Sequence, residues 1–213
     1  MANHPELEFF YDCSSPWTYF AFTRIIPLAE RLQLPIRWRP ILVGGVFNAV
    51  NQQVYTNREA MFTEASNKRR LDYYLKDLRD WAELCGVTAQ WPTGHPINSV
   101  KAMRGAFYAQ QQELLVPYSR AVFEHYWSGD NPDIASDDVL ADICQQVGLD
   151  SSGFFQAIAD PHYKDLLRLN TDELIDRGGF GSPTIFINGD DMYFGNDRLE
   201  LVEFRLKGLM AKG

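Results

Sequence analysis

The chain has 213 residues, of which 46% are hydrophobic and 23% are charged, a composition typical of a globular domain that buries a core of its own. Its formal net charge of −8 opposes the electrostatic attraction that drives binding to nucleic acid, so we expect no nucleic-acid partner. The first residues lack the basic and apolar regions of a signal peptide, and no run of about 18 apolar residues follows, so we expect no membrane partner.

Cysteine and histidine usage indicates neither a disulfide framework nor a metal site. Cys13, Cys85 and Cys144 are odd in number and far apart, which suits neither a secreted scaffold nor a zinc site. The four histidines show no metal-ligand spacing, so we expect solvated or locally hydrogen-bonded roles and no metal. Cys13 is expected to be a buried, inert thiol. A reducing cytoplasm is the expected location.

The N-terminal elements predict a parallel pair of strands. Residues 6–12 form an apolar, aromatic-rich run that predicts a strand. From Pro16 onward, apolar residues recur at helical spacing. Residues 35–40 alternate apolar and basic side chains between two prolines and predict a second strand. A strand, a helix and a second strand in close succession indicate a right-handed crossover.

The central part of the chain is helical in pattern and nearly free of strand signals. Asp150 and the two serines after it supply N-cap chemistry before Phe154. We therefore expect a helical insertion over residues 57–175 within an α/β domain formed by residues 1–56 and 176–213. The predicted helices cover Arg69 to Cys85, Ile97 to Gln112, Pro117 to Trp127, Ser136 to Val147 and His162 to Arg177.

The C-terminal elements predict a hairpin and a closing helix. Residues 184–188 and 191–194 are apolar runs on either side of Asn188-Gly189-Asp190, and an Asn-Gly step between such runs is a strong hairpin signal. Residues 198–210 then predict the last helix. The hairpin adds antiparallel strands to the sheet.

Ser15 and Pro16 stand where the first strand meets the first helix. A serine N-cap followed by proline is explained by helix-start preferences alone. The same helix end also stabilises an anion such as a thiolate, and a serine hydroxyl can cap the helix and still donate to sulfur. Thr18 occupies the position where a redox enzyme of this pattern carries its second cysteine. The site therefore suits a thiol that the chain does not supply.

Two further stretches carry candidate binding residues. Only about 5 to 6% of X-Pro bonds are cis, which favours a trans Ser182-Pro183 bond; a cis bond would present the Ser182 backbone to an extended thiol peptide. Asn196 is predicted to be the N-cap of the last helix, with Asp197 in its first turn. Together they offer the charges that an amino-acid head group requires.

Four motifs in the same order carry a resemblance to a known family. The chain resembles the 2-hydroxychromene-2-carboxylate isomerases and the kappa-class glutathione transferases, within the wider DsbA family. The resemblance implies a thioredoxin-like α/β fold with a large all-helical insertion, a cytoplasmic homodimer and glutathione as the cofactor. The motifs are residues 10–19, Gly44-Gly45-Val46-Phe47, Phe180-Gly181-Ser182-Pro183-Thr184 and Phe194-Gly195-Asn196-Asp197-Arg198.

The resemblance also implies roles for individual residues. Ser15 resembles the catalytic serine that faces the glutathione sulfur, and Ser182 with Pro183 resembles the cis-proline clamp on the cysteinyl backbone. Asn196 and Asp197 resemble the residues that bind the γ-glutamyl group. The remaining candidates are Asn51 or Gln52 for glutathione or substrate, Arg70 or its neighbours Lys68 and Arg69 for the glycyl end, and Trp17, Phe47 and Trp91 for a substrate pocket.

The expected activity is a glutathione-dependent isomerisation. Its substrates would be 2-hydroxychromene-2-carboxylate, or a related cyclic aromatic pyruvate, and trans-o-hydroxybenzylidenepyruvate. The alternative is a kappa-like transferase or peroxidase that consumes glutathione. A disulfide oxidoreductase is weaker because Ser15-Pro16-Trp17-Thr18 cannot form an internal disulfide, and a non-enzymatic binding protein would show no glutathione affinity.

Overall fold

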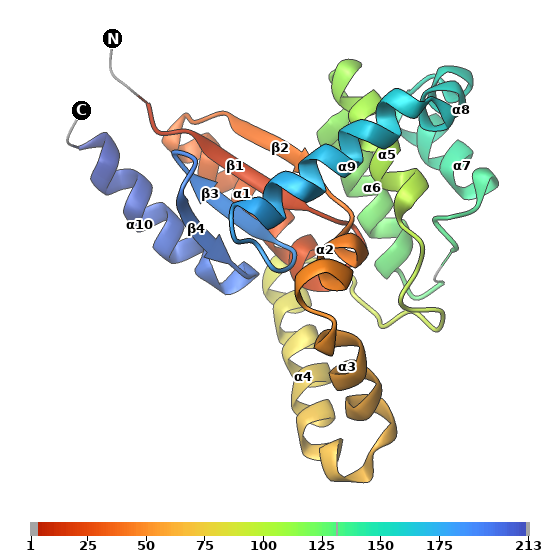
Figure 1. The fold of residues 1–213 in the computed structure, drawn as a ribbon, viewed down its shortest axis with the longest axis vertical. Helices are drawn as coiled ribbons and strands as arrows, with labels where there is room; N and C mark the ends of the chain where they lie inside the picture. Colours follow the sequence, from red (N-terminus) through yellow and green to blue (C-terminus); the bar gives the residue numbers. More distant parts are fainter. Residues whose placement is uncertain (1–3, 131, 212–213) are drawn as a thin grey trace.

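The computed structural model describes residues 4–130 and 132–211, and its described strands form one four-stranded sheet (Figure 1). The strands are β1 (Leu7–Tyr11), β2 (Ile36–Pro40), β3 (Thr184–Ile187) and β4 (Asp191–Phe194), in the order β2-β1-β3-β4. β1 is parallel to β2 and antiparallel to β3, and β3 is antiparallel to β4. The predicted parallel pair and the predicted hairpin are both confirmed.

Helix α1 (Pro16–Leu32) makes the crossover between β1 and β2. It starts at the predicted place, because Ser15 caps it by accepting the N–H of Thr18 and Pro16 occupies its first turn. It ends at Gln33, whose left-handed backbone (φ 54°) returns its N–H to the last turn. α1 thereby places Ser15 at the carboxyl end of β1.

The two faces of the sheet bury different side chains. Leu7, Phe9 and Tyr11 alternate onto the face that packs into the larger core with α1. Phe10 lies on the opposite face in a smaller cluster with Phe186, which α2 (Val43–Val50) and α9 (Pro161–Asp176) cover (Figure 1). Because strand side chains alternate between faces, β1 is buried on both sides.

The predicted helices between the two halves of the sheet are confirmed, with ends that differ by a few residues. Asp150 caps α8 by accepting the N–H groups of Ser152 and Gly153 at 3.1 and 3.0 Å. No helix within the described residues is long and apolar enough to cross a membrane. These helices are α4 (Lys68–Cys85), α5 (Val100–Gln111), α6 (Leu115–Trp127), α7 (Asp137–Val147), α8 (Ser151–Ala159) and α9, and the predicted closing helix is α10 (Leu199–Met210), after the hairpin.

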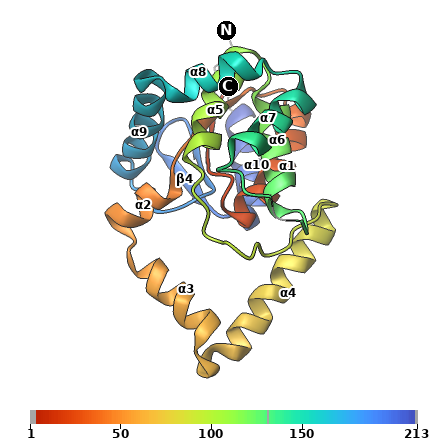
Figure 2. The ribbon, with the colours of Figure 1, turned by 90° about the vertical axis from the view of Figure 1, so that its right-hand side faces the viewer.

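Helices α2 and α3 (Gln53–Thr63) were not expected from the sequence. α3 buries none of its residues, so its sequence carries no apolar stripe that a helical period could reveal. A short 3-10 turn, η1 (Ala65–Asn67), joins α3 to α4. Helices α3 and α4 form an arm that extends from the rest of the molecule, and η1 is the turn at the tip of this arm (Figure 2).

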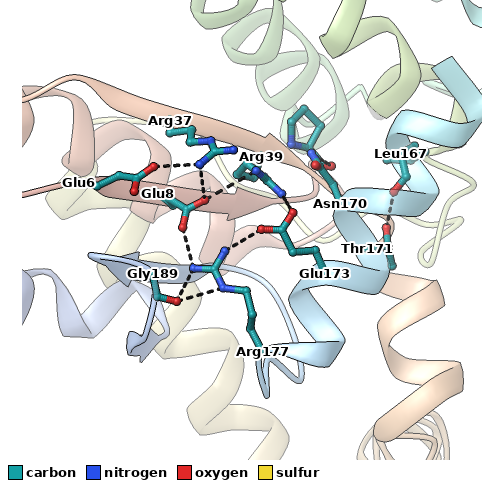
Figure 3. A network of polar contacts seen from close by, with 11 residues as sticks. Glu6, Glu8, Arg37, Arg39, Leu167, Asn170, Thr171, Glu173, Arg177 and Gly189 are labelled. Carbon is teal, nitrogen blue, oxygen red and sulfur yellow. Dashed lines mark hydrogen bonds and ion pairs between the residues drawn. The ribbon is translucent and has the colours of Figure 1, made fainter. Parts of the chain in front are cut away.

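A group of ion pairs attaches the end of α9 to the sheet (Figure 3). Glu8 of β1 is 2% exposed and accepts from Arg177 Nη2 at 2.6 Å. Arg39 Nη1 lies 3.7 Å from the other Glu8 oxygen, while Glu173 of α9 pairs with both Arg39 and Arg177. Arg177 also donates to the carbonyl of Gly189 in the hairpin. These contacts fix the point at which the chain leaves α9 for residues 178–183.

Candidate active site

Ser15 joins the start of α1 to the segment that enters β3. Its Oγ accepts the N–H of Thr18 at 3.3 Å and donates to the carbonyl oxygen of Ser182 at 3.2 Å. The side chain is partly buried and lines a cavity. The hydroxyl can therefore redirect its proton to a ligand that enters beside Ser182 without giving up the helix cap.

Ser182 precedes a cis peptide bond to Pro183. The trans bond that base rates favour is therefore wrong, and the cis bond implied by the family resemblance is present. The Ser182 hydroxyl accepts the N–H of Asp12 at 3.0 Å and lies 2.8 Å from Thr18 Oγ1. Tertiary contacts with β1 and α1 thus surround this serine, and no local pattern could reveal them.

Asp12 lies beneath the site and connects three segments. Its carboxylate accepts the N–H groups of Ser14 at 2.9 Å and Val43 at 2.8 Å, and the hydroxyl of Ser99 at 3.0 Å. Burial raises the pKa of this carboxyl group, while these hydrogen bonds lower it. The sequence analysis missed Asp12, because its partners come from segments up to 87 residues away.

Cys13 is buried behind the site, as predicted. Its N–H approaches Met103 Sδ at 3.5 Å, and its carbonyl oxygen accepts from Trp127 Nε1 at 3.0 Å. Burial raises the pKa of the Cys13 thiol well above its usual value. A thiol in this environment is a poor nucleophile.

The cavity beside Ser15 has a volume of about 710 Å³ and is lined mainly by apolar and aromatic side chains. Trp17, Phe47 and Trp91, the three predicted pocket residues, all line it. Tyr74 of α4 connects two of them edge-on, with ring centroids 5.4 Å from Trp17 and 5.7 Å from Trp91. The sequence analysis did not select Tyr74, because the helical pattern of residues 69–85 does not show which side chains each residue contacts. The volume and lining suit a small aromatic ligand.

The structure separates the two candidates at the end of α2. Asn51 lines the cavity, and its Nδ2 donates to the carbonyl of Phe180 at 3.4 Å. Gln52 is exposed, donates to the carbonyl of Asn48 at 2.8 Å and does not line the cavity. Of the pair, Asn51 is the residue within reach of a ligand in the cavity.

The basic triplet lies away from the cavity. Lys68, Arg69 and Arg70 are exposed at the start of α4, at the tip of the arm (Figure 2). Lys68 pairs with Asp72 one turn further along α4, and none of the three lines the cavity. The basic residue of the arm that does line it is Arg58 of α3, which the sequence analysis did not select.

The segment before α10 contacts Pro183. The N–H of Gly195 donates to the carbonyl of Pro183 at 3.1 Å. Gly195 has φ of +107°, a backbone conformation that favours glycine. Asp197 itself is half-exposed and pairs with Arg198 at 2.9 Å. It borders the clamp but does not line the cavity.

Asn196 does not cap the last helix, so that prediction is wrong. A 3-10 turn, η2 (Asn196–Arg198), starts at this residue, and Arg24 Nη1 donates to its carbonyl oxygen at 2.9 Å. Its side chain is buried, and the Nδ2 atom has no hydrogen-bond partner within the described part of the chain. Asn196 does not line the cavity, and a buried donor without a partner calls for an acceptor such as an ordered water or a ligand atom.

Comparison with known proteins agrees with this geometry. The family model of the DSBA-like thioredoxin domain matches residues 6–207. A 2-hydroxychromene-2-carboxylate isomerase of Pseudomonas putida is 31% identical over 92% of each chain. The chain belongs to the 2-hydroxychromene-2-carboxylate isomerase family of DsbA-like thioredoxin domains. Kappa 1 glutathione transferase of Rattus norvegicus is 26% identical over 94% of this chain and 90% of its own.

Solved structures support the same fold. The structure of a 2-hydroxychromene-2-carboxylate isomerase matches with a TM-score of 0.83 and 29% identity, over 97% of this chain and 96% of the other. A probable DsbA oxidoreductase of Streptomyces coelicolor matches with a TM-score of 0.78 at 16% identity, over 99% and 92% of the two chains. The latter likeness shows the fold alone. The expected thioredoxin-like fold is therefore confirmed.

Proposed function

We propose that the protein is a glutathione-dependent isomerase that interconverts 2-hydroxychromene-2-carboxylate, or a related cyclic aromatic pyruvate, and trans-o-hydroxybenzylidenepyruvate. The observation that carries the proposal is Ser15: a hydroxyl at a helix start, bonded to the Ser182 carbonyl, at the wall of an aromatic cavity. The names of the relatives support the substrate class and the use of glutathione.

The residues at the site fit glutathione. The buried Nδ2 of Asn196 lacks a partner within the described chain, next to the Gly195–Pro183 hydrogen bond. Asn196 and Asp197 would hold the γ-glutamyl group, and Ser182 with Pro183 would hold the cysteinyl backbone. Glutathione supplies a nucleophilic thiolate that adds reversibly to a conjugated double bond.

The protein's own residues would stabilise the thiolate and orient the aromatic substrate. Ser15 would donate a hydrogen bond to the sulfur and so favour the anion, helped by the positive end of the helix dipole at the start of α1. Trp17, Tyr74 and Trp91 would hold the aromatic ring and exclude water. The single bond created by addition can then rotate before the thiol leaves.

The test combines spectroscopy with a thiol balance. Ultraviolet spectra of 2-hydroxychromene-2-carboxylate should relax toward the trans open form only when glutathione is present, while total reduced glutathione stays constant. Ser15→Ala should lower kcat by roughly a hundredfold or more, and Ser152→Ala, an exposed serine on α8, serves as the matched control. Relaxation that is independent of glutathione would reject the proposal.

The measurement of total reduced glutathione also separates the isomerase from the second candidate function. The kappa-class relatives support a transferase, which would consume glutathione in proportion to turnover. A fall in total reduced glutathione would therefore replace the isomerase with a transferase. We further propose a cytoplasmic homodimer, as the family resemblance implies, and sedimentation of the purified protein at several concentrations tests the dimer.

A further inference from the structure

The charge in the cavity comes from one side chain. Of the described residues that line it, Arg58 of α3 is the only one with a full charge, and none is an aspartate or glutamate. Arg58 makes no ion pair within the described part of the chain, since no carboxylate lies within 4.0 Å of it. A cation among aromatic rings without a counter-ion favours an anionic ligand.

His95 holds this guanidinium in place. Arg58 Nη1 lies 3.2 Å from His95 Nε2, and His95 Nδ1 lies 2.7 Å from the hydroxyl of Tyr126. A guanidinium only donates, so Nε2 must accept and the ring proton must be on Nδ1, from where it is donated to Tyr126. The chain of donors therefore runs in one direction, from Arg58 through a neutral imidazole to Tyr126.

His95 and Tyr126 are held by packing against aromatic side chains outside the arm. Tyr126 of α6 is 2% exposed, and the His95 ring lies 4.5 Å from the Trp91 ring and 5.8 Å from the Trp127 ring. Burial and the neighbouring Arg58 lower the pKa of His95 to about 3, so that it stays neutral and accepts. One edge of Arg58 is thus fixed, while its other N–H groups remain available for a carboxylate.

We propose that Arg58, positioned by His95 and Tyr126, binds the carboxylate of an aromatic acid in the cavity and so selects anionic over neutral substrates. The proposal rests on the proposed function for the identity of the reaction, but the binding site itself does not depend on turnover. A planar guanidinium binds a carboxylate through two parallel hydrogen bonds. The ligand's ring would then lie against Trp91 and Tyr74, which contact each other edge-on.

Binding without catalysis tests the proposal. Trans-cinnamate and its neutral, isosteric amide are titrated into the protein without glutathione, with tryptophan fluorescence as the signal. Cinnamate should bind roughly tenfold to a hundredfold more tightly than the amide. Arg58→Met should abolish this ratio by weakening only cinnamate, and Arg58→Lys should retain part of it. Arg70→Met, at the exposed tip of the arm, is the matched control and should retain all of it.

The positioning role has its own readout. His95→Phe keeps a ring against Trp91 but removes the acceptor, so the cinnamate-to-amide ratio should fall, while amide binding changes little. His95→Gln restores an acceptor and should recover part of the ratio. Tyr126→Phe, which removes only the hydroxyl, should lower it by severalfold. An unchanged ratio in His95→Phe would overturn the positioning role.

Failure of this proposal is distinguishable from failure of the proposed function. Equal affinities for cinnamate and its amide, absence of saturable cinnamate binding, or a ratio that survives Arg58→Met would each overturn the role of Arg58, whatever the isomerase assay shows. A ratio that depends on Arg58 in a protein without isomerase activity would uphold the carboxylate site and reject the proposed reaction.

Discussion

The side chains around Ser15 are joined by hydrogen bonds between β1, α1 and the segment that enters β3. Thr18 is fully buried, and its hydroxyl meets that of Ser182 at 2.8 Å, so the position suited to a second cysteine here supports the clamp residue. Ser182 in turn receives the N–H of Asp12. The hydroxyl groups at these two positions therefore hold the Ser182-Pro183 segment against the end of β1 and the start of α1.

Replacement of Thr18 tests this coupling. Thr18→Val preserves shape but removes one buried hydrogen bond, so the unfolding free energy should fall by about 1–2 kcal/mol in chemical denaturation. Thr23→Val is the control, because its hydroxyl donates to the carbonyls of Tyr19 and Phe20 in its own helix, and its loss should cost at most about 0.5 kcal/mol. Equal costs would contradict the special role of the Thr18–Ser182 contact.

The environment of His95 predicts a defined dependence of stability on pH. Its folded-state pKa of about 3 lies below its ordinary value of 6.5, so between these values the unfolded chain binds a proton that the folded chain does not. Unfolding free energy should therefore fall as pH decreases through this window, by at most about 1.4 kcal/mol per pH unit from this residue. Above about pH 6.5 the contribution should be absent.

Denaturation curves at neutral and mildly acidic pH check this prediction. Both His95→Phe and His95→Gln remove the titrating group, so both should lose less stability on acidification than the unmodified protein. The two variants differ in hydrogen bonding and packing but share the loss of titration. A flattened pH dependence in only one of them would assign the effect to packing instead.

At the residue scale, sequence patterns identified side chains next to a proline at the start of a helix or strand, and missed side chains that only folding brings together. Ser15 and Ser182 each stand beside a proline, and Trp17 follows at once, so a linear pattern could select them. Asp12 carries no such signal, and Pro96, which follows His95, opens neither a strand nor a helix. The roles of Asp12 and His95 depend on partners 87 and 37 residues away, which only the folded chain brings within hydrogen-bond distance.

At the scale of secondary-structure elements, helix α9 is attached to the sheet through charged side chains. Glu8 is buried among Arg37, Arg39 and Arg177 (Figure 3), and Arg177 also lies over the ring of Phe186 at 3.8 Å. A buried carboxylate of this kind is stable only because its charge is compensated. The network therefore sets where residues 178–183 begin, and with them the clamp.

Removal of that one charge should have a large effect. Glu8→Gln keeps the shape of the side chain but removes the buried negative charge between Arg39 and Arg177, which then share only Glu173, so the unfolding free energy should fall by about 3 kcal/mol. Asp72→Asn breaks the exposed Lys68–Asp72 pair of α4 and should cost at most about 0.5 kcal/mol. Comparable losses for the two variants would show that the buried network is not what seats α9.

The elements also show where pattern reading fails. α1, with Ser15 as cap and a buried apolar face, was identified because two independent signals coincide. α3 has no buried face, so it lacks the amphipathic period from which helices are recognised. α2 buries Val43 and Val46, but its eight residues include Gly44 and Gly45 and are too few to reveal a period. The strands were easier, because β1 and the β3–β4 hairpin have strong local signals.

On the scale of the whole molecule, the arm formed by α3 and α4 is the part least supported by the core. α3 buries none of its residues, and α4 buries only Leu78 and Ala82. Nevertheless α3 contributes Tyr55, Arg58 and Met61 to the cavity wall. Part of the cavity wall is therefore formed by α3, a helix with no buried residue.

This arrangement predicts a local response to ligands. Backbone amides of α3 should exchange hydrogen faster than those of the buried α6, and addition of glutathione with cinnamate should slow exchange in α3 while leaving α6 unchanged. Hydrogen exchange followed by mass spectrometry of peptides measures both. Protection of α3 equal to that of α6 before any ligand is added would show that another contact, such as a second copy of the chain, already supports the arm.

The absence of cysteine from the described lining of the cavity has a consequence for the durability of the protein. An enzyme whose working sulfur belongs to its own chain is lost when peroxide carries that atom to the sulfinic or sulfonic acid. Here Cys13 and Cys144 are buried and Cys85 packs against α1, so in the proposed reaction oxidation would fall on the glutathione thiol. Under that proposal an oxidised glutathione molecule would leave and an intact one would bind in its place, so the protein itself would not be inactivated.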